Sequence, residues 1–205
     1  MAPHRLAVIV MVGQLLWLPS GTEAAPDPCS LPTGAEKRPA AGVLLTLRPG
    51  SGKVTFHADA RLHEFTGTTR EVSGWFRTDD LRTPTEATGC VGVEAASLET
   101  GIGLRDTKMR TNHLETDRYP DIVYRVNAIV RVGDQLLLAG TLTLHGVSRS
   151  VRVPIQITPL PDGARVKGAV TLDIRDYDIP IPRFLFVRMK PEVVVTFDTL
   201  WQRIS

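Results

Sequence analysis

Apolar residues recur at every second position along most of this chain, and that period restricts it to β-strands. Side chains of a strand point alternately to the two faces of a sheet, so an apolar set at alternate positions marks a buried face. Two less regular segments, 72–78 and 91–98, accompany the regular ones and bring the expected total to about eight strands. The regular segments are 54–62, 122–130, 136–144, 151–157, 166–174 and 193–201.

Turn-forming sequences separate these segments, as expected for antiparallel neighbours joined by short connections. They include 131–134 (Arg-Val-Gly-Asp), 145–146 (His-Gly) and 161–163 (Pro-Asp-Gly). Eight such strands close into a barrel or stack as a sandwich, and a barrel of about eight strands is just wide enough to hold one small ligand. The fold class predicted here is therefore all-β and antiparallel.

Two stretches break the alternation. The first, 100–118, is densely charged and predicts a short helix or irregular crossover that ends before Pro120. The second, 176–186, contains Pro180 and Pro182 and so does not form a central strand. It is too apolar for an ordinary exposed loop, which indicates a cap over an opening or a plug packed into one.

The N-terminus has the organisation of a secretory signal peptide. Arg5 precedes an apolar run over 6–18, and small residues stand at Thr22 and Ala24, before the expected cut. A buried helix is the alternative, but the flanking residues fit processing better. We expect a signal peptide over 1–24, an N-terminal tail rich in Pro, Ala and Gly over 25–50, and a barrel domain over 51–205.

These boundaries predict a periplasmic or secreted protein. No later segment approaches the ~20 consecutive apolar residues of a membrane-spanning helix, so no transmembrane span is expected. Cys29 and Cys90 are the only cysteines, and in an oxidising compartment they have one possible intramolecular pairing. The chain has no Cys-x-x-Cys spacing, which disfavours a redox or metal pair. A net charge of +2 argues against nucleic acid as a partner.

Small residues stand among the bulky ones in the apolar phase of several strands. If their neighbours leave the space open, the result is an apolar cavity that binds an apolar ligand. If large side chains fill the space, the same residues belong to an ordinary core, and the sequence leaves both readings open. The residues concerned are Ala58, Ala60, Ala128, Gly140 and Gly168.

Five segments carry a further signal because they match one family in the family's own order. They are 54–67, with an opening strand and a His-containing turn, 72–76, 97–110, 119–124 and 140–149. The last, Gly-Thr-Leu-Thr-Leu-His-Gly-Val-Ser-Arg, is the most specific. The chain thus resembles the YceI-like family of periplasmic polyisoprenoid-binding proteins, over roughly residues 52 to 200.

This resemblance implies an eight-stranded, lipocalin-like barrel with a long apolar pore. It also implies a long-chain apolar ligand, a polyisoprenoid or an isoprenoid quinone, which the protein would bind, carry or store. Some members of the family form dimers, so the resemblance leaves a homodimer open without predicting one. A different class of function is a barrel filled by its own side chains that acts as a protein-interaction module.

Polar candidates for ligand binding lie at strand ends and in the crossover. His63 and His145 stand beside turns in matched segments, where each would bind a polar head group or satisfy backbone groups of its turn. Arg105 would hold a head group or form a structural ion pair with Asp106. Gly140 should face the cavity, so that Gly140→Leu would reduce ligand uptake more than stability.

Aromatic and aliphatic residues in the apolar phase are candidate contacts for the ligand's tail, and ordinary core packing is the alternative for each. They are Phe56, Trp75, Phe76, Tyr124, Leu142, Phe184 and Phe186.

Catalysis is not expected, and neither are a cofactor or a metal. The chain lacks a Gly-x-Ser-x-Gly elbow and a glycine-rich phosphate loop. Its histidines do not have the short spacing of strand or helix metal ligands. A weak hydrolase or isomerase that uses His63 or His145 is the remaining enzyme hypothesis.

Overall fold

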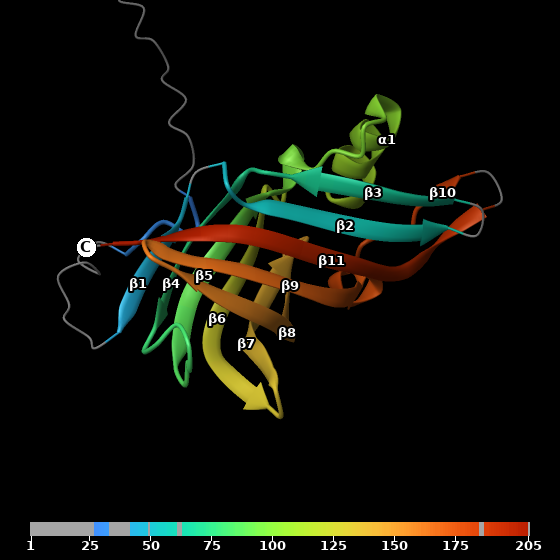
Figure 1. Ribbon diagram of the computed structural model, residues 1–205. Helices are drawn as coiled ribbons and strands as arrows, with labels where there is room; N and C mark the ends of the chain where they lie inside the picture. The colour runs from blue at the N-terminus through green and yellow to red at the C-terminus, as the bar shows by residue number, and fades with distance from the viewer. Residues whose placement is uncertain (1–26, 33–41, 49, 61–62, 185–186, 205) are drawn as a thin grey trace, which may run out of the picture.

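Antiparallel strands account for most of the computed structural model, which describes residues 27–32, 42–48, 50–60, 63–184 and 187–204 (Figure 1). The predicted signal peptide lies outside these residues. The strands are β1 (Val43–Leu47), β2 (Lys53–Ala60), β3 (His63–Thr69), β4 (Val72–Thr78), β5 (Ala87–Glu94), β6 (Asp121–Val132), β7 (Gln135–Leu144), β8 (Val147–Leu160), β9 (Gly163–Asp173), β10 (Arg183–Phe184) and β11 (Val187–Arg203).

The sheet closes on itself in the strand order β1-β4-β5-β6-β7-β8-β9-β11, because β11 pairs with β1. The ring therefore contains eight strands, and the predicted eight-stranded antiparallel barrel is confirmed. β2 and β3 form a hairpin that continues from the other part of the same β11 edge. β1 and β2 together therefore act as one interrupted strand along β11. β3 and β4 act as a second interrupted strand, with β3 paired to β2 and β4 paired to β1.

The barrel begins earlier than the sequence predicted. β1 starts at Val43, inside the stretch assigned to the tail, and its Leu45 is fully buried. The strand was missed because it is only 5 residues long and lies between Gly42 and the Pro49-Gly50 pair, which read as loop. The lower boundary of the barrel domain at residue 51 was therefore wrong.

The predicted alternation of side chains was wrong for the second part of β6, because the strand contains a β-bulge. The pairing with β7 shifts between Val126 and Ala128, and an extra residue at this point reverses the alternation that follows. Ile129 is consequently buried, whereas Val130, expected inside, is 41% exposed.

Short helices lie in the two stretches that broke the alternation. α1 (Gly103–Lys108) and the π-helical turn η3 (Met109–His113) form the crossover before β6, as predicted. The 3₁₀ turns are η2 (Ala95–Ser97) and η4 (Ile174–Tyr177), and η4 begins the segment after β9. In the described ranges, no helix is long and apolar enough to cross a membrane.

A disulfide joins Cys29 to Cys90, as expected, and fixes the N-terminal segment to β5. Both cysteines are buried, and Trp75 and Val123 pack against them. Trp75 therefore belongs to the cluster around the disulfide, not to the interior as predicted. The sequence held a signal for this difference. Adjacent side chains of a strand point to opposite faces, so Trp75 and Phe76 do not both face the interior, and it is Phe76 that lines it.

Removal of the disulfide tests how much this attachment stabilises the barrel. The Cys29→Ala, Cys90→Ala double variant should lose about 2–4 kcal/mol of unfolding free energy, because a cross-link over 61 residues restricts the unfolded chain. Urea denaturation measures the loss. A reductant should bring the wild type to the same midpoint and leave the variant unchanged. Equal midpoints for the oxidised wild type and the variant would contradict the prediction.

Candidate functional site

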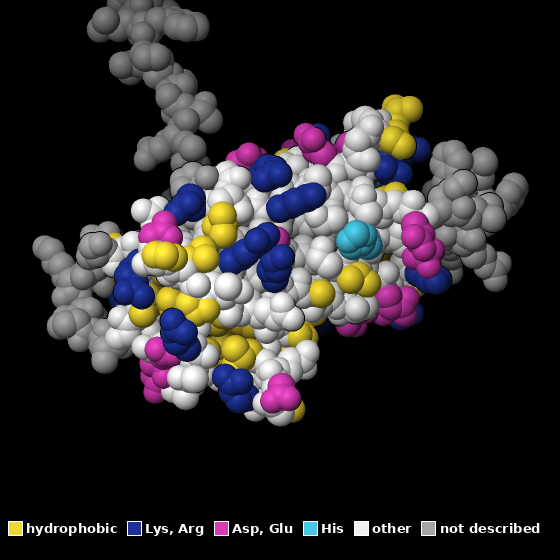
Figure 2. All heavy atoms as spheres, viewed as in Figure 1, with side chains coloured by type: hydrophobic (Ala, Val, Ile, Leu, Met, Phe, Trp, Pro, Cys, Tyr) yellow, Lys and Arg dark blue, Asp and Glu magenta, His cyan; other side chains and the backbone are white. Residues whose placement is uncertain are grey.

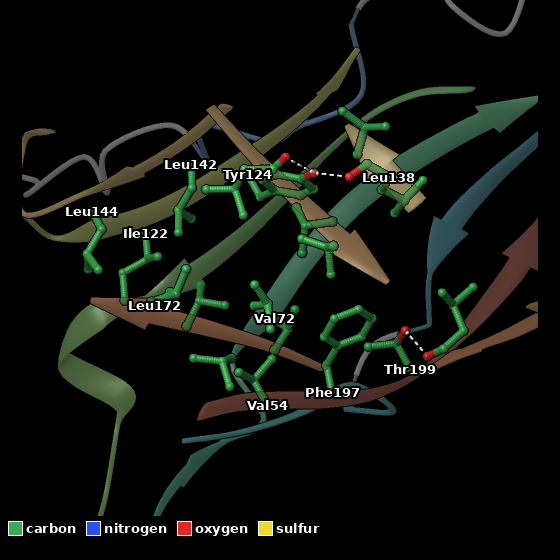
Figure 3. A pocket seen from close by; sticks show the side chains of 18 of the residues that line it. Val54, Val72, Ile122, Tyr124, Leu138, Leu142, Leu144, Leu172, Phe197 and Thr199 are labelled. Atoms are coloured by element: carbon green, nitrogen blue, oxygen red, sulfur yellow. Dashed lines mark hydrogen bonds between the residues drawn. The ribbon is translucent and has the colours of Figure 1, made fainter. Parts of the chain in front are cut away.

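An apolar cavity of about 210 Å³ lies inside the barrel (Figure 3). Its walls come from strands all around the ring, and most of the side chains are valine or leucine. Ile122, Leu144 and Leu172 lie toward one end, whereas Leu138, Phe197 and Thr199 lie toward the other. The lining is elongated along the barrel, which suits a chain-like ligand better than a compact one.

Three lining side chains carry polar atoms, and each of these atoms has a partner within the protein. The Tyr124 hydroxyl donates to the carbonyls of Leu138 at 2.8 Å and Val151 at 3.2 Å. Thr199 Oγ1 donates to the Val166 carbonyl, and Trp201 Nε1 donates to Thr199 Oγ1, both at 2.9 Å. The cavity thus offers dispersion contacts and burial from water, but no free side-chain polar group for a ligand.

Burial also controls the chemistry of the tyrosine. Desolvation raises the pKa of Tyr124 to about 12, because a phenolate in this apolar interior would lose its hydration. The hydroxyl is therefore neutral at physiological pH and serves as a structural donor.

Aromatic rings cover three glycines of the barrel interior. A Cβ at Gly67 would lie 2.2 Å from the ring of Phe56, and one at Gly168 would lie 2.4 Å from the ring of Phe197. At Gly140 a Cβ would lie 3.0 Å from Tyr124 Cζ and 2.2 Å from the Arg125 carbonyl oxygen. The absence of a side chain at these glycines makes room for aromatic rings and for closely approaching backbone. The space they leave is therefore filled, and it does not form the cavity.

This geometry corrects the expectation for Gly140. The position does not face open space, so Gly140→Leu would disrupt the fold before it affected a ligand. Of the predicted tail contacts, those that line the cavity are Phe56, Phe76, Tyr124 and Leu142. Their contact with a ligand stays a prediction. Phe197 and Trp201 also line it; they stand in the apolar phase of 193–201 and were not singled out.

His145 and Arg105 lie outside the cavity lining. His145 Nδ1 is 3.1 Å from the Tyr177 carbonyl oxygen, and its ring packs edge-on against Tyr119, so it holds its turn to η4. Arg105 lies 4.5 Å from the centre of the Phe65 ring, which packs edge-on against Phe56. Arg105 is thus separated from the cavity by two aromatic rings.

The side chains of His63 and Phe184 lie outside the described part of the structure, as does the whole of Phe186. In the described part of the chain, no group of three His, Cys, Asp or Glu residues is placed to hold a metal.

The segment that follows β9 packs over the barrel at the α1 end. Ile174, Tyr177 and Ile179 are buried in a second apolar cluster with Leu144 and Met189. His113 Nδ1, in the crossover, lies 2.9 Å from the Pro180 carbonyl oxygen. The expected cap or plug is thus a packed cluster tied to the crossover, and the described backbone of this segment continues to β10.

A closed antiparallel barrel of eight strands, with an apolar cavity and a helical crossover, defines a lipocalin-like β-barrel. The chain belongs to the YceI-like family, since the YceI-like domain matches residues 45–200. It is 31% identical over 86 residues to UPF0312 protein plu2095 of Photorhabdus laumondii, and 29% identical over 92 residues to Protein YceI of Shigella flexneri. The two matches cover 42% and 44% of this chain, respectively. They cover 44% and 48% of the two relatives, so the chain spans less than half the length of each.

Solved structures share the fold over a larger part of the chain. BcnA of Burkholderia cenocepacia has a TM-score of 0.67 at 16% identity, covering 75% of this chain and 98% of that one. A polyisoprenoid-binding domain of Saccharophagus degradans, implicated in plant cell wall breakdown, has a TM-score of 0.62 at 19% identity, covering 79% and 99%.

Gly140→Ala tests the close approach at the β6 bulge. The added methyl would meet backbone that does not move independently, so the variant should lose about 2 kcal/mol or more of unfolding free energy. Gly103→Ala is the matched control, because a Cβ there meets nothing within 4 Å, and its stability should stay equal or rise by up to about 1 kcal/mol. Denaturant midpoints decide, and equal effects in the two variants would refute the prediction.

Tyr124→Phe tests the buried hydroxyl. Because the folded pKa is raised, the contribution of the hydroxyl to stability is complete below pH 10 and is lost as the pH rises toward about 12. The wild type should therefore exceed the variant by about 1–2 kcal/mol at neutral pH, and the difference should shrink between these limits. Unfolding free energies at several alkaline pH values measure it. A pH-independent difference would argue against a buried phenol.

Proposed function

We propose that this protein binds a long-chain isoprenoid-type lipid inside the barrel and carries or stores it without catalysing a reaction. The observation behind the proposal is the cavity wall, which is aliphatic and aromatic and whose side-chain polar atoms already have partners. A polar ligand would lose its hydration there without gaining a hydrogen bond from a side chain, whereas an apolar ligand gains free energy by leaving water.

The length of the ligand follows from the size and shape of the cavity. Its 210 Å³ is below the ~300–1,000 Å³ of pockets that enclose drug-sized ligands. An elongated space of this size would hold part of a polyisoprenoid or isoprenoid quinone, with the remainder outside or in a widened barrel. The structural likeness to a polyisoprenoid-binding domain supports this ligand class.

A barrel filled by its own side chains, acting as an interaction module, is the weaker alternative because the interior holds a cavity. The predicted signal peptide and the disulfide support a periplasmic or secreted location, since disulfides persist in oxidising compartments.

Val170→Phe tests whether the cavity is the binding site. Val170 lines the cavity, and the neighbouring Ala169 is exposed, so Ala169→Phe is the matched control. The larger ring should displace about two methylene groups of ligand, each worth ~0.8 kcal/mol when buried, and raise the Kd roughly tenfold. Quenching of Trp201, which lines the cavity, by a short-tailed ubiquinone reports binding. Similar Kd values for both variants would place the site elsewhere.

The natural ligand is sought by native mass spectrometry of protein purified from its host. The proposal expects a bound species that organic extraction removes and that carries isoprene units. Repeated recovery of ligand-free protein that also fails to quench with the quinone would overturn it.

A further inference from the structure

The crossover presents two apolar side chains to solvent at its tip. Ile102 is 54% exposed and Leu104 is 82% exposed, which makes Leu104 the most exposed large hydrophobic residue in the described part of the chain. Both lie at the start of α1, and Figure 2 shows hydrophobic atoms at the tip of the projection that Figure 1 labels α1, with Lys or Arg atoms nearby. Two exposed apolar side chains that project together make this tip a candidate interaction site.

Side-chain bonds fix the base of this tip. The buried Asp106 carboxylate accepts from the backbone N–H and the hydroxyl of Thr100, and Arg105 Nε donates to the same hydroxyl at 2.7 Å. Arg110 Nη2 donates to the Leu98 carbonyl at 3.1 Å. The exposure of Leu104 is therefore imposed by a bonded scaffold.

The charges around the tip are mainly positive. From 100 to 113, the cations are Arg105, Lys108 and Arg110, and the acid is Asp106, which is buried and bound to Thr100. Lys108 is exposed and stands one helical turn after Leu104 in α1. The acids Glu99, Glu115 and Asp117 flank this stretch in the sequence; Glu99 pairs with Thr68 of β3, and Glu115 lies 3.8 Å from Arg118. An apolar tip with cations beside it complements a surface that combines hydrocarbon with anionic head groups.

The crossover also lies over one end of the cavity. It connects Leu98 to Ile122, and both residues line the cavity. From the crossover, Arg105 packs on Phe65, and Phe65 packs on the cavity-lining Phe56. A surface that met the tip would therefore lie close to this end of the barrel.

We propose that the crossover tip docks on an anionic lipid bilayer, with Ile102 and Leu104 inserted in the interface and Lys108 near the lipid phosphates. Two projecting side chains suit a deformable bilayer better than a protein partner, since a stable protein interface buries about 800 Å² on each side. The docking extends the proposed function by placing the cavity end beside a source of lipid, yet the binding itself does not require that function.

Vesicle flotation of the oxidised protein tests the docking. The wild type should float with phosphatidylcholine vesicles that contain phosphatidylglycerol, bind much less to phosphatidylcholine alone, and dissociate as salt rises. Ile102→Gln with Leu104→Gln should lower the partition coefficient tenfold or more, because burial of one such side chain is worth roughly tenfold. Lys108→Gln should lower it about fivefold.

Val132→Gln is the matched control. Val132 is 57% exposed, as Ile102 is at 54%, and it lies at the tip of the β6–β7 hairpin, away from α1 (Figure 1). This variant should partition like the wild type. The docking would be overturned if the Ile102/Leu104 variant partitioned like the wild type. It would also be overturned if Val132→Gln lowered the partition coefficient as much as the Ile102/Leu104 variant does. A wild-type dimer without vesicles that the Ile102/Leu104 variant dissociates would instead identify the tip as a contact between copies.

Failure of the docking and failure of the proposed function are separated by the quinone titration without vesicles. The tip variants should quench like the wild type, because neither Ile102 nor Leu104 lines the cavity. Retained quenching with no flotation of the wild type would refute the docking alone. Flotation without quenching would refute the cavity as the quinone site and leave the docking intact.

Discussion

Closure of the sheet by β11 is the constraint on which the remaining structure depends. Backbone groups at a sheet edge need partners, and a barrel supplies them only if the last strand reaches the first. The 17 residues of β11 pair with β9 on one edge and are shared by β1 and β2 on the other. This sharing makes a short β1 sufficient, because three pairs, among them Leu47 with Trp201, close the ring.

Once the ring is closed, its interior is lined mainly by apolar side chains, and a buried polar atom there needs a hydrogen-bond partner. Tyr124 meets this condition by donating to carbonyls of β7 and β8, and its ring lies over Gly140. The same arrangement of ring and glycine recurs for Phe197 with Gly168. The rings occupy the space that the glycines leave, so the cavity is bounded mainly by branched aliphatic side chains.

Periodicity predicted much of this barrel, because the alternation of a strand and its buried face depend on the same geometry. Side chains such as Phe56 and Leu142, which stand in the apolar phase of their strands, accordingly line the interior. The bulge in β6 was not predictable, since an extra residue leaves no mark on composition. Gly140 was misjudged for a related reason: whether a glycine faces space or a ring depends on the rotamer of a residue on the adjacent strand.

Beside the crossover, the outer edge of β3 carries little backbone pairing. Along the outer edge of β3, in the described residues, the pairing is a single bridge between Thr68 and Glu99. Adjacent strands of the ring share ladders of three to eleven residue pairs, with a bulge in the β6–β7 ladder, so separating two of them would break several hydrogen bonds together. Side-chain contacts, such as Arg105 on Phe65, cover the remaining gap. Local opening at this edge would break only the bridge, so the packing of Arg105 and Phe65 contributes more to its stability than backbone pairing does.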